Sequence, residues 1–338
     1  MAQEVRVAAV NLDVSGLWRR ERRGATSGTG GGAGGCVAAL TRLARQAAAE
    51  GAQLVLFPAL SGMVFTAEGA EALRRWGEGG APKTGKAGEE AEVAAAWRDA
   101  ACAALGELAR ELDLHLVAGW LAEAGEEGRF RHETAVIGPD GAVLGRQAQT
   151  HATRKEAAQG LATVDRLTPI ETALGRLGVV AGTDAWYPEV SRILALSGAD
   201  VLLFPEAVAG AYPFWRQVAG AWQEVQQNQV FGVESGLAGG PFRGRAAIFG
   251  PCELTPGQTG QLAGVGIPYG AVTDLRQPLP GGDEETLRTE ALVLADLDFG
   301  RLAEVRRSYP IFAMLNPGAY QHYFPGVYDR PAGEGNGA

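Results

Sequence analysis

A short pattern occurs twice in this chain, and it constrains the fold more than any other feature. Residues 50–59 read EGAQLVLFPA, and residues 197–206 read SGADVLLFPE. In each copy a glycine follows a predicted helix, as expected of a left-handed helix cap, and a short apolar strand then ends at a Phe-Pro pair. Two copies of one helix–strand unit predict an α/β fold made of two similar half-sheets packed together.

Strands and helices alternate along the rest of the chain. We predict strands at residues 5–10, 53–57, 114–119, 177–181, 201–204, 231–235, 244–249 and 291–297. Helices are predicted at residues 36–50, 93–112, 189–197, 215–230 and 299–306. A Pro-Asp-Gly turn between two apolar segments predicts a hairpin over residues 133–147. Polar loops interrupt the pattern at residues 16–35 and 77–92.

No change in composition divides the chain. We therefore expect a single domain over residues 1–325, followed by a C-terminal tail over residues 326–338. The end of that tail is rich in glycine, and we expect it to be disordered.

The composition argues against several classes of function. A net charge of −9 and a pI near 5.1 disfavour nucleic acid and anionic membranes as partners. The chain has no apolar segment near the roughly 20 residues of a membrane helix, and its start lacks the features of a signal peptide. Its three cysteines form no Cys-x-x-Cys pair, and its four histidines show no metal-binding spacing. We expect a cytoplasmic protein with no metal and no other cofactor.

Three segments of the chain read LVLFPA at residues 54–59, GRQAQTH at residues 145–151, and GVVAGTDAWYPE at residues 178–189. In this order they resemble the catalytic segments of the nitrilase superfamily of carbon–nitrogen hydrolases. In that family the first segment reads FPE, the second carries a lysine two residues before a histidine, and the third reads C-x-D-x-x-x-P-E. The resemblance extends over about residues 5–325.

The resemblance implies a fold and an oligomeric state. Family members have an α/β fold, a four-layer α-β-β-α sandwich of two mixed sheets, and usually pair into dimers. A homodimer or a higher homo-oligomer is therefore expected here.

The resemblance also implies a missing triad. The family's Glu, Lys and Cys positions match Ala59, Gln149 and Gly182. None of these three side chains can serve as base, cation or thiol nucleophile. Three separate replacements indicate natural divergence, and they predict a protein that is inactive by the cysteine mechanism.

Several acids near these positions are candidates for a remaining pocket. Glu156 matches a second glutamate of the family, and Glu206 takes the place in the second repeat that Ala59 has in the first. Glu133 stands where the family usually has asparagine. His151 follows the lysine position by two residues, and together with Glu156 and Glu206 it could form a new acid–base group.

Three further candidates flank the cysteine position or could fill the space beside it. Thr183 is the next residue after the cysteine position, where strand alternation would direct its side chain elsewhere. Tyr187 and Trp215 are large enough to occupy the volume left by the smaller residues.

Two functions remain open at this point. The first is a nitrilase-like protein without cysteine catalysis, which keeps a pocket for a small amide-like ligand or binds a partner protein, such as an active paralogue. The second is a carbon–nitrogen hydrolase that acts on an amide-like substrate by an altered acid/base mechanism. A nucleotide-binding loop at residues 80–87 is disfavoured, because the segment ends in alanine where a hydroxyl residue is needed.

Overall fold

The structure is a computed structural model, which describes residues 4–18, 32–82, 90–125, 129–210, 218–265 and 289–328. Trp215, residues 329–338 of the predicted tail, and parts of both polar loops lie outside the described residues.

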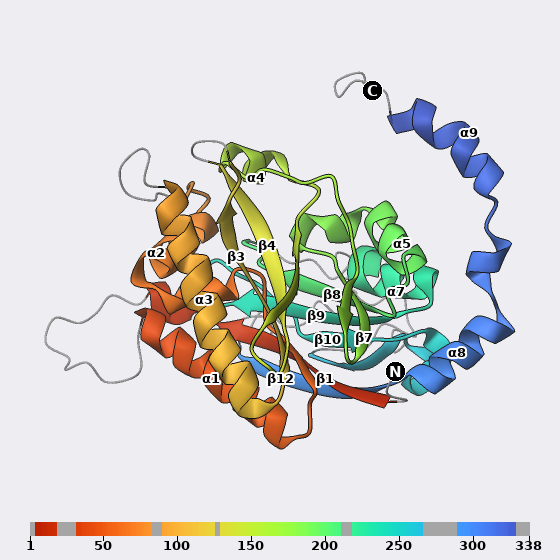
Figure 1. Ribbon diagram of the computed structural model, residues 1–338, viewed down its shortest axis with the longest axis horizontal. Helices are drawn as coiled ribbons and strands as arrows, with labels where there is room; N and C mark the ends of the chain where they lie inside the picture. Colours follow the sequence, from red (N-terminus) through yellow and green to blue (C-terminus); the bar gives the residue numbers. More distant parts are fainter. Residues whose placement is uncertain are drawn as a thin grey trace, which may run out of the picture.

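Within the described residues, twelve strands form two halves with the same arrangement (Figure 1). The first half has the order β12-β1-β2-β3-β4-β5, from strands Ala291–Asp298, Glu4–Asp13, Leu54–Leu56, His115–Glu123, Phe130–Ile137 and Val143–Ala148. The second has the order β6-β7-β8-β9-β10-β11, from strands Ile170–Thr172, Gly175–Val179, Val201–Glu206, Phe231–Ala238, Ala247–Phe249 and Gln261–Gly264.

The pairing repeats strand for strand. In each half three central strands are parallel, and the remaining strands pair antiparallel at the two edges. The halves are joined where Asn11–Asp13 at the end of β1 pairs in parallel with Gly236–Ala238 at the end of β9. The repeated sequence is therefore the sign of a repeated architecture, with β2 and β8 at the centre of each half.

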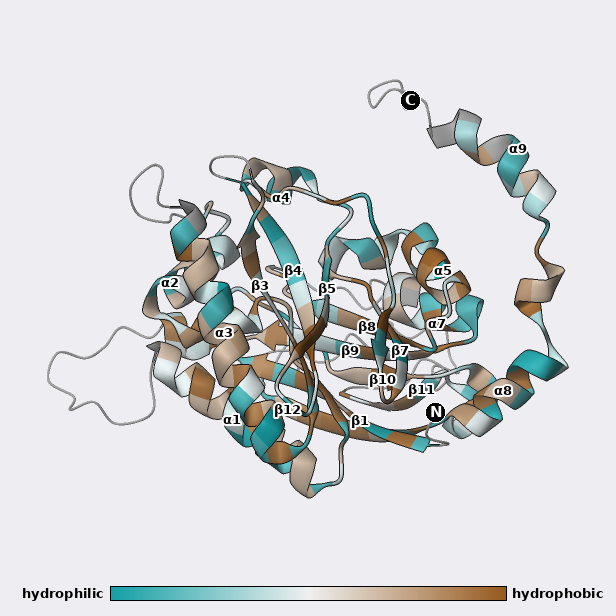
Figure 2. Cartoon of the chain, viewed as in Figure 1, coloured by the Kyte–Doolittle hydropathy of each residue, from teal (hydrophilic) through white to brown (hydrophobic). Residues whose placement is uncertain are grey.

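Helices cover the two outer faces. Helices α1 (Gly32–Ala49), α2 (Ala67–Gly77) and α3 (Glu90–Leu112) lie over the first half, and helices α5 (Pro188–Leu196) and α7 (Gln223–Asn228) lie over the second (Figure 1). In Figure 2 the helices α1 and α3 alternate between hydrophobic and hydrophilic residues, as expected of helices with one buried face.

Strand alternation sorts the core into three layers. Leu54 and Leu56 face the second half-sheet, whereas Val55 and Phe57 face α1 and α3. In the second half, the side chains at 201 and 203 face the first half, and those at 202 and 204 face α5 and α7. The order helix, sheet, sheet, helix confirms the predicted four-layer sandwich.

Most predicted elements are confirmed within one to four residues. Gly51 and Gly198, predicted as left-handed caps, have φ values of +82° and +95°. The predicted helix at 215–230 is described only from residue 218, where an irregular turn precedes α7. The prediction missed α2, the short α4 (Arg154–Ala158), β6 and β11.

The C-terminal part leaves the body of the molecule. After β12, α8 (Phe299–Ser308) still packs on the second half through Leu302 and Arg306, whereas Figure 1 shows α9 (Pro317–Tyr328) extending away from the sandwich. Over the described ranges, no helix combines the length and the apolar character that crossing a membrane requires.

Candidate functional site

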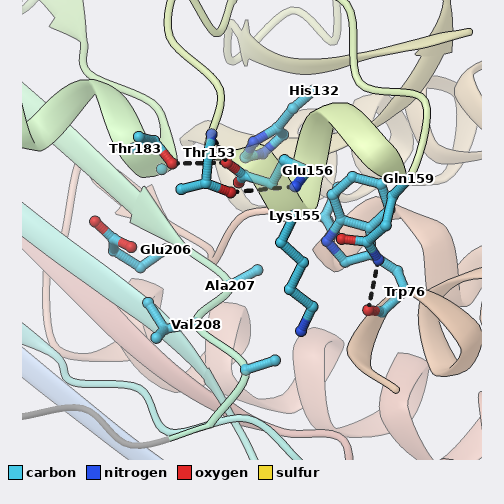
Figure 3. A pocket seen from close by; sticks show the side chains of 13 residues that line it. Trp76, His132, Thr153, Lys155, Glu156, Gln159, Thr183, Glu206, Ala207 and Val208 are labelled. Carbon is cyan, nitrogen blue, oxygen red and sulfur yellow. Dashed lines mark hydrogen bonds between the residues drawn. The ribbon is translucent and has the colours of Figure 1, made fainter. Parts of the chain in front are cut away.

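A cavity of about 280 Å³ lies at the carboxyl ends of β7 and β8, where antiparallel β4 begins. Such edges are where α/β proteins form clefts. Figure 3 shows side chains from both halves and from α2 and α4 around it. The lining residues are Leu60, Trp76, His132, Thr153, Lys155, Glu156, Gln159, Gly182, Thr183, Glu206, Ala207, Val208 and Ala209.

Gly182 lines this cavity, and Gln149 is buried beside it. Gly182 comes three residues after β7, has a φ of +53°, and begins a 3-10 turn, η3 (Gly182–Trp186). A Cβ placed on Gly182 would lie only 2.8 Å from Gln149 Oε1. The side chain of Gln149 is fully buried beside Gly182, so the amide oxygen takes the space that a side chain at 182 would need.

The residue that follows Ala59 in the sequence lines the same cavity. Ala59 is fully buried, and Leu60, the next residue, lines the cavity. Leu60 has a φ of +61°, a left-handed conformation that is unusual for a residue with a side chain. Backbone strain of this kind is concentrated at functional sites.

His132 and Gln149 form a buried hydrogen-bonded pair. His132 Nδ1 lies 2.8 Å from Gln149 Oε1, and Gln149 Nε2 donates to the backbone oxygen of His151 at 2.5 Å. The backbone N–H of Gln149 also donates to the oxygen of His132 at 3.0 Å. Complete burial lowers the pKa of His132, so its imidazole is neutral near pH 7.

Asp184 holds the segment that carries Gln149. Its buried carboxylate accepts hydrogen bonds from the backbone N–H groups of Thr150 and His151 and from the Thr150 hydroxyl, at 2.8 to 3.0 Å. Burial raises the pKa of Asp184, although these hydrogen bonds and that from the His151 ring act in the opposite direction. The family-like Asp184 therefore ties η3 to residues 149–151.

Glu156 and Thr183 form a second polar pair. Thr183 Oγ1 donates to Glu156 Oε2 at 2.9 Å (Figure 3). The same carboxylate oxygen accepts the backbone N–H of Thr153 at 2.7 Å, which completes a capping box at the start of α4. The strand-alternation argument for Thr183 was wrong, because the chain turns at Gly182 and the side chain faces the cavity.

Lys155, Glu206 and Gln159 are further polar residues of the lining. Lys155 projects from α4, and Glu206, at the end of β8, is buried. On the other side, the Gln159 amide donates to the backbone oxygen of Trp76 at 3.1 Å, which fixes α4 against α2 (Figure 3).

Three predicted candidates do not line this cavity. Glu133 accepts a hydrogen bond from Trp120 Nε1 at 3.1 Å and pairs with Arg146 at 3.3 Å, on the strand face turned toward α3. His151 stacks on Tyr187 with ring centroids 3.6 Å apart, and its Nδ1 lies 3.1 Å from Asp184.

The sequence prediction missed His132 and Lys155 as cavity residues. Strand alternation could have identified His132, since it shares a face with Val136, which packs between the sheets, whereas Glu133 shares a face with Ala135. No signal pointed to Lys155, because the position of α4 depends on contacts with distant α2.

Among the described residues, no group of three or more His, Cys, Asp or Glu side chains is arranged to hold a metal ion. The cysteines lie elsewhere: Cys36 is on α1, Cys102 is on α3, and Cys252 follows β10. The cavity thus offers carboxylates, a neutral imidazole, a hydroxyl and an ammonium group, and no thiol.

Comparisons with known proteins agree with this architecture. A family profile described as carbon-nitrogen hydrolase matches residues 33–261. An omega-amidase from Bos taurus is 26% identical over 227 residues, covering 64% of this chain and 73% of the relative. An N-carbamoylputrescine amidase from Arabidopsis thaliana is 24% identical over 228 residues, covering 65% and 71%.

Solved structures share the fold. A carbon-nitrogen hydrolase from Helicobacter pylori G27 superposes with a TM-score of 0.65 at 17% identity, covering 94% of this chain and 97% of that one. An amidase from Nesterenkonia sp. superposes with a TM-score of 0.60 at 17% identity, covering 91% and 98%.

Proposed function

This chain belongs to the carbon–nitrogen hydrolase family, the nitrilase superfamily, and we propose that it binds a small amide-like ligand without hydrolysing it through a cysteine. In this proposal Ala59, Gln149 and Gly182 stand at the family's Glu, Lys and Cys positions.

One observation carries the proposal. At the position proposed for the nucleophile, Gly182 has no side chain, and a Cβ placed there would lie only 2.8 Å from Gln149 Oε1. A thiolate, a general base and a cation are all needed for the cysteine mechanism, and the loss of one member of such a unit costs several orders of magnitude in rate. The vacant nucleophile position is therefore filled by a neutral amide.

The retained cavity supports a binding role. About 280 Å³ remains beside Gly182, enough for a ligand of a few heavy atoms, and its wall carries both hydrogen-bond acceptors and donors. Two relatives are named as an omega-amidase and an N-carbamoylputrescine amidase, so their names point to amide and carbamoyl compounds.

The test combines binding with turnover. We expect short primary amides to bind, as followed by calorimetry or ligand-detected NMR, while ammonia release stays at background. Glu206→Gln should weaken binding, whereas Glu107→Gln, an exposed acid on α3, should not. Ammonia release that iodoacetamide abolishes would refute the absence of cysteine catalysis.

A second candidate function rests on the Thr183–Glu156 hydrogen bond of 2.9 Å at the cavity. A hydroxyl and a carboxylate in contact, with Glu206 nearby in the lining, are the parts of an altered acid/base hydrolase. Turnover that resists iodoacetamide and is lost in both Glu156→Gln and Thr183→Val would establish this function in place of the first.

We also propose that the protein is a cytoplasmic homodimer or higher homo-oligomer. Large apolar side chains are exposed on η3 and α5 and along the C-terminal segment that leaves the body: Trp186, Tyr187, Ile193, Leu196, Tyr309, Met314, Tyr320 and Phe324. Light scattering should give at least twice the 35.3 kDa chain mass. A modulating role beside an active paralogue would instead require mixed oligomers on co-expression.

A further inference from the structure

The amide of Gln149 has only one orientation that satisfies its surroundings. Its Nε2 donates to the backbone oxygen of His151 at 2.5 Å, a partner that can only accept. The opposite end, Oε1, therefore faces His132 Nδ1 at 2.8 Å and must accept. The hydrogen of a neutral His132 ring is consequently on Nδ1, and Nε2 carries a lone pair.

The Nε2 lone pair has no protein partner among the described residues. His132 lines the cavity, its side chain is buried, and Nε2 has no hydrogen-bond donor within the described ranges. A buried acceptor without a partner costs free energy comparable to a lost hydrogen bond. This atom is therefore a place where a bound molecule would gain a hydrogen bond.

The groups around the ring determine its charge. Burial, the largest effect, lowers the pKa of His132, whereas the hydrogen bond to Gln149 and the charges of Glu156 on α4 and Asp184 on η3 act to raise it. Glu206 from β8 and Lys155 from α4 line the same cavity with opposite charges. A neutral ring accepts at Nε2, whereas a protonated ring would donate there.

We propose that Gln149 locks His132 in the Nδ1-protonated tautomer, so that His132 Nε2 accepts a hydrogen bond from an N–H group of the ligand. This inference rests on the proposed function, since it names the ligand group that the same cavity recognises. Gln149 acts here as a positioning residue, and His132 Nε2 is the atom that recognises the ligand's N–H group.

The other lining groups favour the same ligand chemistry. The carboxylates of Glu156 and Glu206 are acceptors when ionised, so a ligand that presents N–H donors meets acceptors on more than one side. A ligand oxygen placed at Nε2 would face a lone pair instead. The site thus selects a primary amide or another N–H donor over an isosteric compound with a methyl group there.

The tautomer can be measured without any ligand. In the full chain labelled with 15N-histidine, the ring of His132 should show a protonated Nδ1 and an unprotonated Nε2, assigned from its loss in His132→Phe. In Gln149→Leu, which keeps the volume but removes the acceptor, the two tautomers should mix. An unprotonated Nδ1 in the unaltered protein would overturn the proposal, whatever binds in the cavity.

Ligand selection is tested with two probes of the same shape. Propionamide and butanone share a carbonyl group, but only propionamide has N–H groups. Propionamide should bind at least about tenfold more tightly, since the amide gains an acceptor that the ketone leaves unused. His132→Phe should remove this preference, and Gln149→Leu should reduce it while leaving the imidazole in place.

His115→Gln provides the matched control. Like His132, His115 is a buried histidine, and its Nδ1 lies 3.3 Å from the backbone oxygen of Gln53. It is the first residue of β3, at the strand end opposite the cavity. The preference should survive this change. Equal binding of both probes, or equal loss in His115→Gln and His132→Phe, would overturn the inference and leave the proposed function standing. If neither probe binds, the proposed function fails, and the tautomer measurement still decides the role of Gln149.

Discussion

Gly182→Ala should lower the free energy of unfolding for two physical reasons, which can be measured separately. The first cause is the backbone, because φ at this residue is +53°. A left-handed conformation costs a residue with a side chain roughly 1–2 kcal/mol. The second is the contact, because a Cβ would lie 2.8 Å from Gln149 Oε1, closer than atoms of this kind approach.

Relieving that contact requires the Gln149 amide to move. Because Oε1 accepts the hydrogen bond of His132 Nδ1 at 2.8 Å, the movement leaves a buried donor without its partner. Such a loss costs roughly 1–3 kcal/mol. The Gly182→Ala protein should therefore lose about 2–5 kcal/mol of its free energy of unfolding, the sum of both effects.

Gly51→Ala isolates the backbone effect. Gly51 also has a positive φ, +82°, but a Cβ there would meet only Arg6 Cδ at an ordinary 3.8 Å. Urea unfolding should give a loss of about 1–2 kcal/mol for this variant. In a Gln149→Ala background the cost of Gly182→Ala should fall to the same value, because the clashing atom is gone. Equal losses for Gly182→Ala and Gly51→Ala in the unaltered background would refute the reasoning.

Three further outcomes are expected. Gly182→Cys alone should show no amidase turnover, measured as ammonia release, and any activity gained should require the triple change with Ala59→Glu and Gln149→Lys. Equal activity of the single and triple variants would contradict the mapping of the triad. Burial raises the pKa of Glu224 to about 7, so the folded state holds an extra proton between pH 4.5 and 7. Ionisation of this group should therefore lower the free energy of unfolding by roughly 3 kcal/mol as pH rises through that range. In denaturant titrations at pH 5 and 8, Glu224→Gln should reduce this dependence on pH. Glu156→Ala should lose about 0.5–2 kcal/mol of unfolding free energy by breaking the capping box, whereas a change at the exposed Glu107 should leave stability within the error of the measurement.

Sequence patterns predicted two packed half-sheets with helices, because these follow from local rules, and the resemblance to the family supplied the order of the four layers. The segments 54–56 and 201–204 are apolar on both faces, and each follows a glycine cap, so their burial could be predicted from the sequence. The resemblance to the family placed Gln149 and Gly182 near each other, although 33 positions separate them in the sequence.

The polar details of the site could not be predicted in the same way. Strand alternation separates the faces of His132 and Glu133, but the place of the His132 side chain at the cavity depends on how β4 pairs with β3 and β5. Thr183 was a pocket candidate and lines the cavity, but strand alternation gave the wrong direction for its side chain because the chain leaves the strand before that residue. Lys155 lies on a five-residue helix whose place is fixed by Gln159 and the backbone of α2, a contact between residues 83 positions apart.

Gly182, Gln149 and His132 depend on one another, so a change at one of them should lower the stability contributed by the other two. Only a glycine at 182 leaves room for the Gln149 amide, as the 2.8 Å distance to a Cβ shows. Only a donor such as His132 Nδ1 satisfies the buried amide oxygen, which has no water-exposed surface. A lysine at 149 would place a charge beside the imidazole and disfavour its protonation further, and it would leave Nδ1 without an acceptor. His132 and Gln149 thus form a neutral hydrogen-bonded pair beside Gly182, at the positions that we propose for the family's cation and thiolate. A binding site for an uncharged N–H donor is the chemistry that such a unit can still perform.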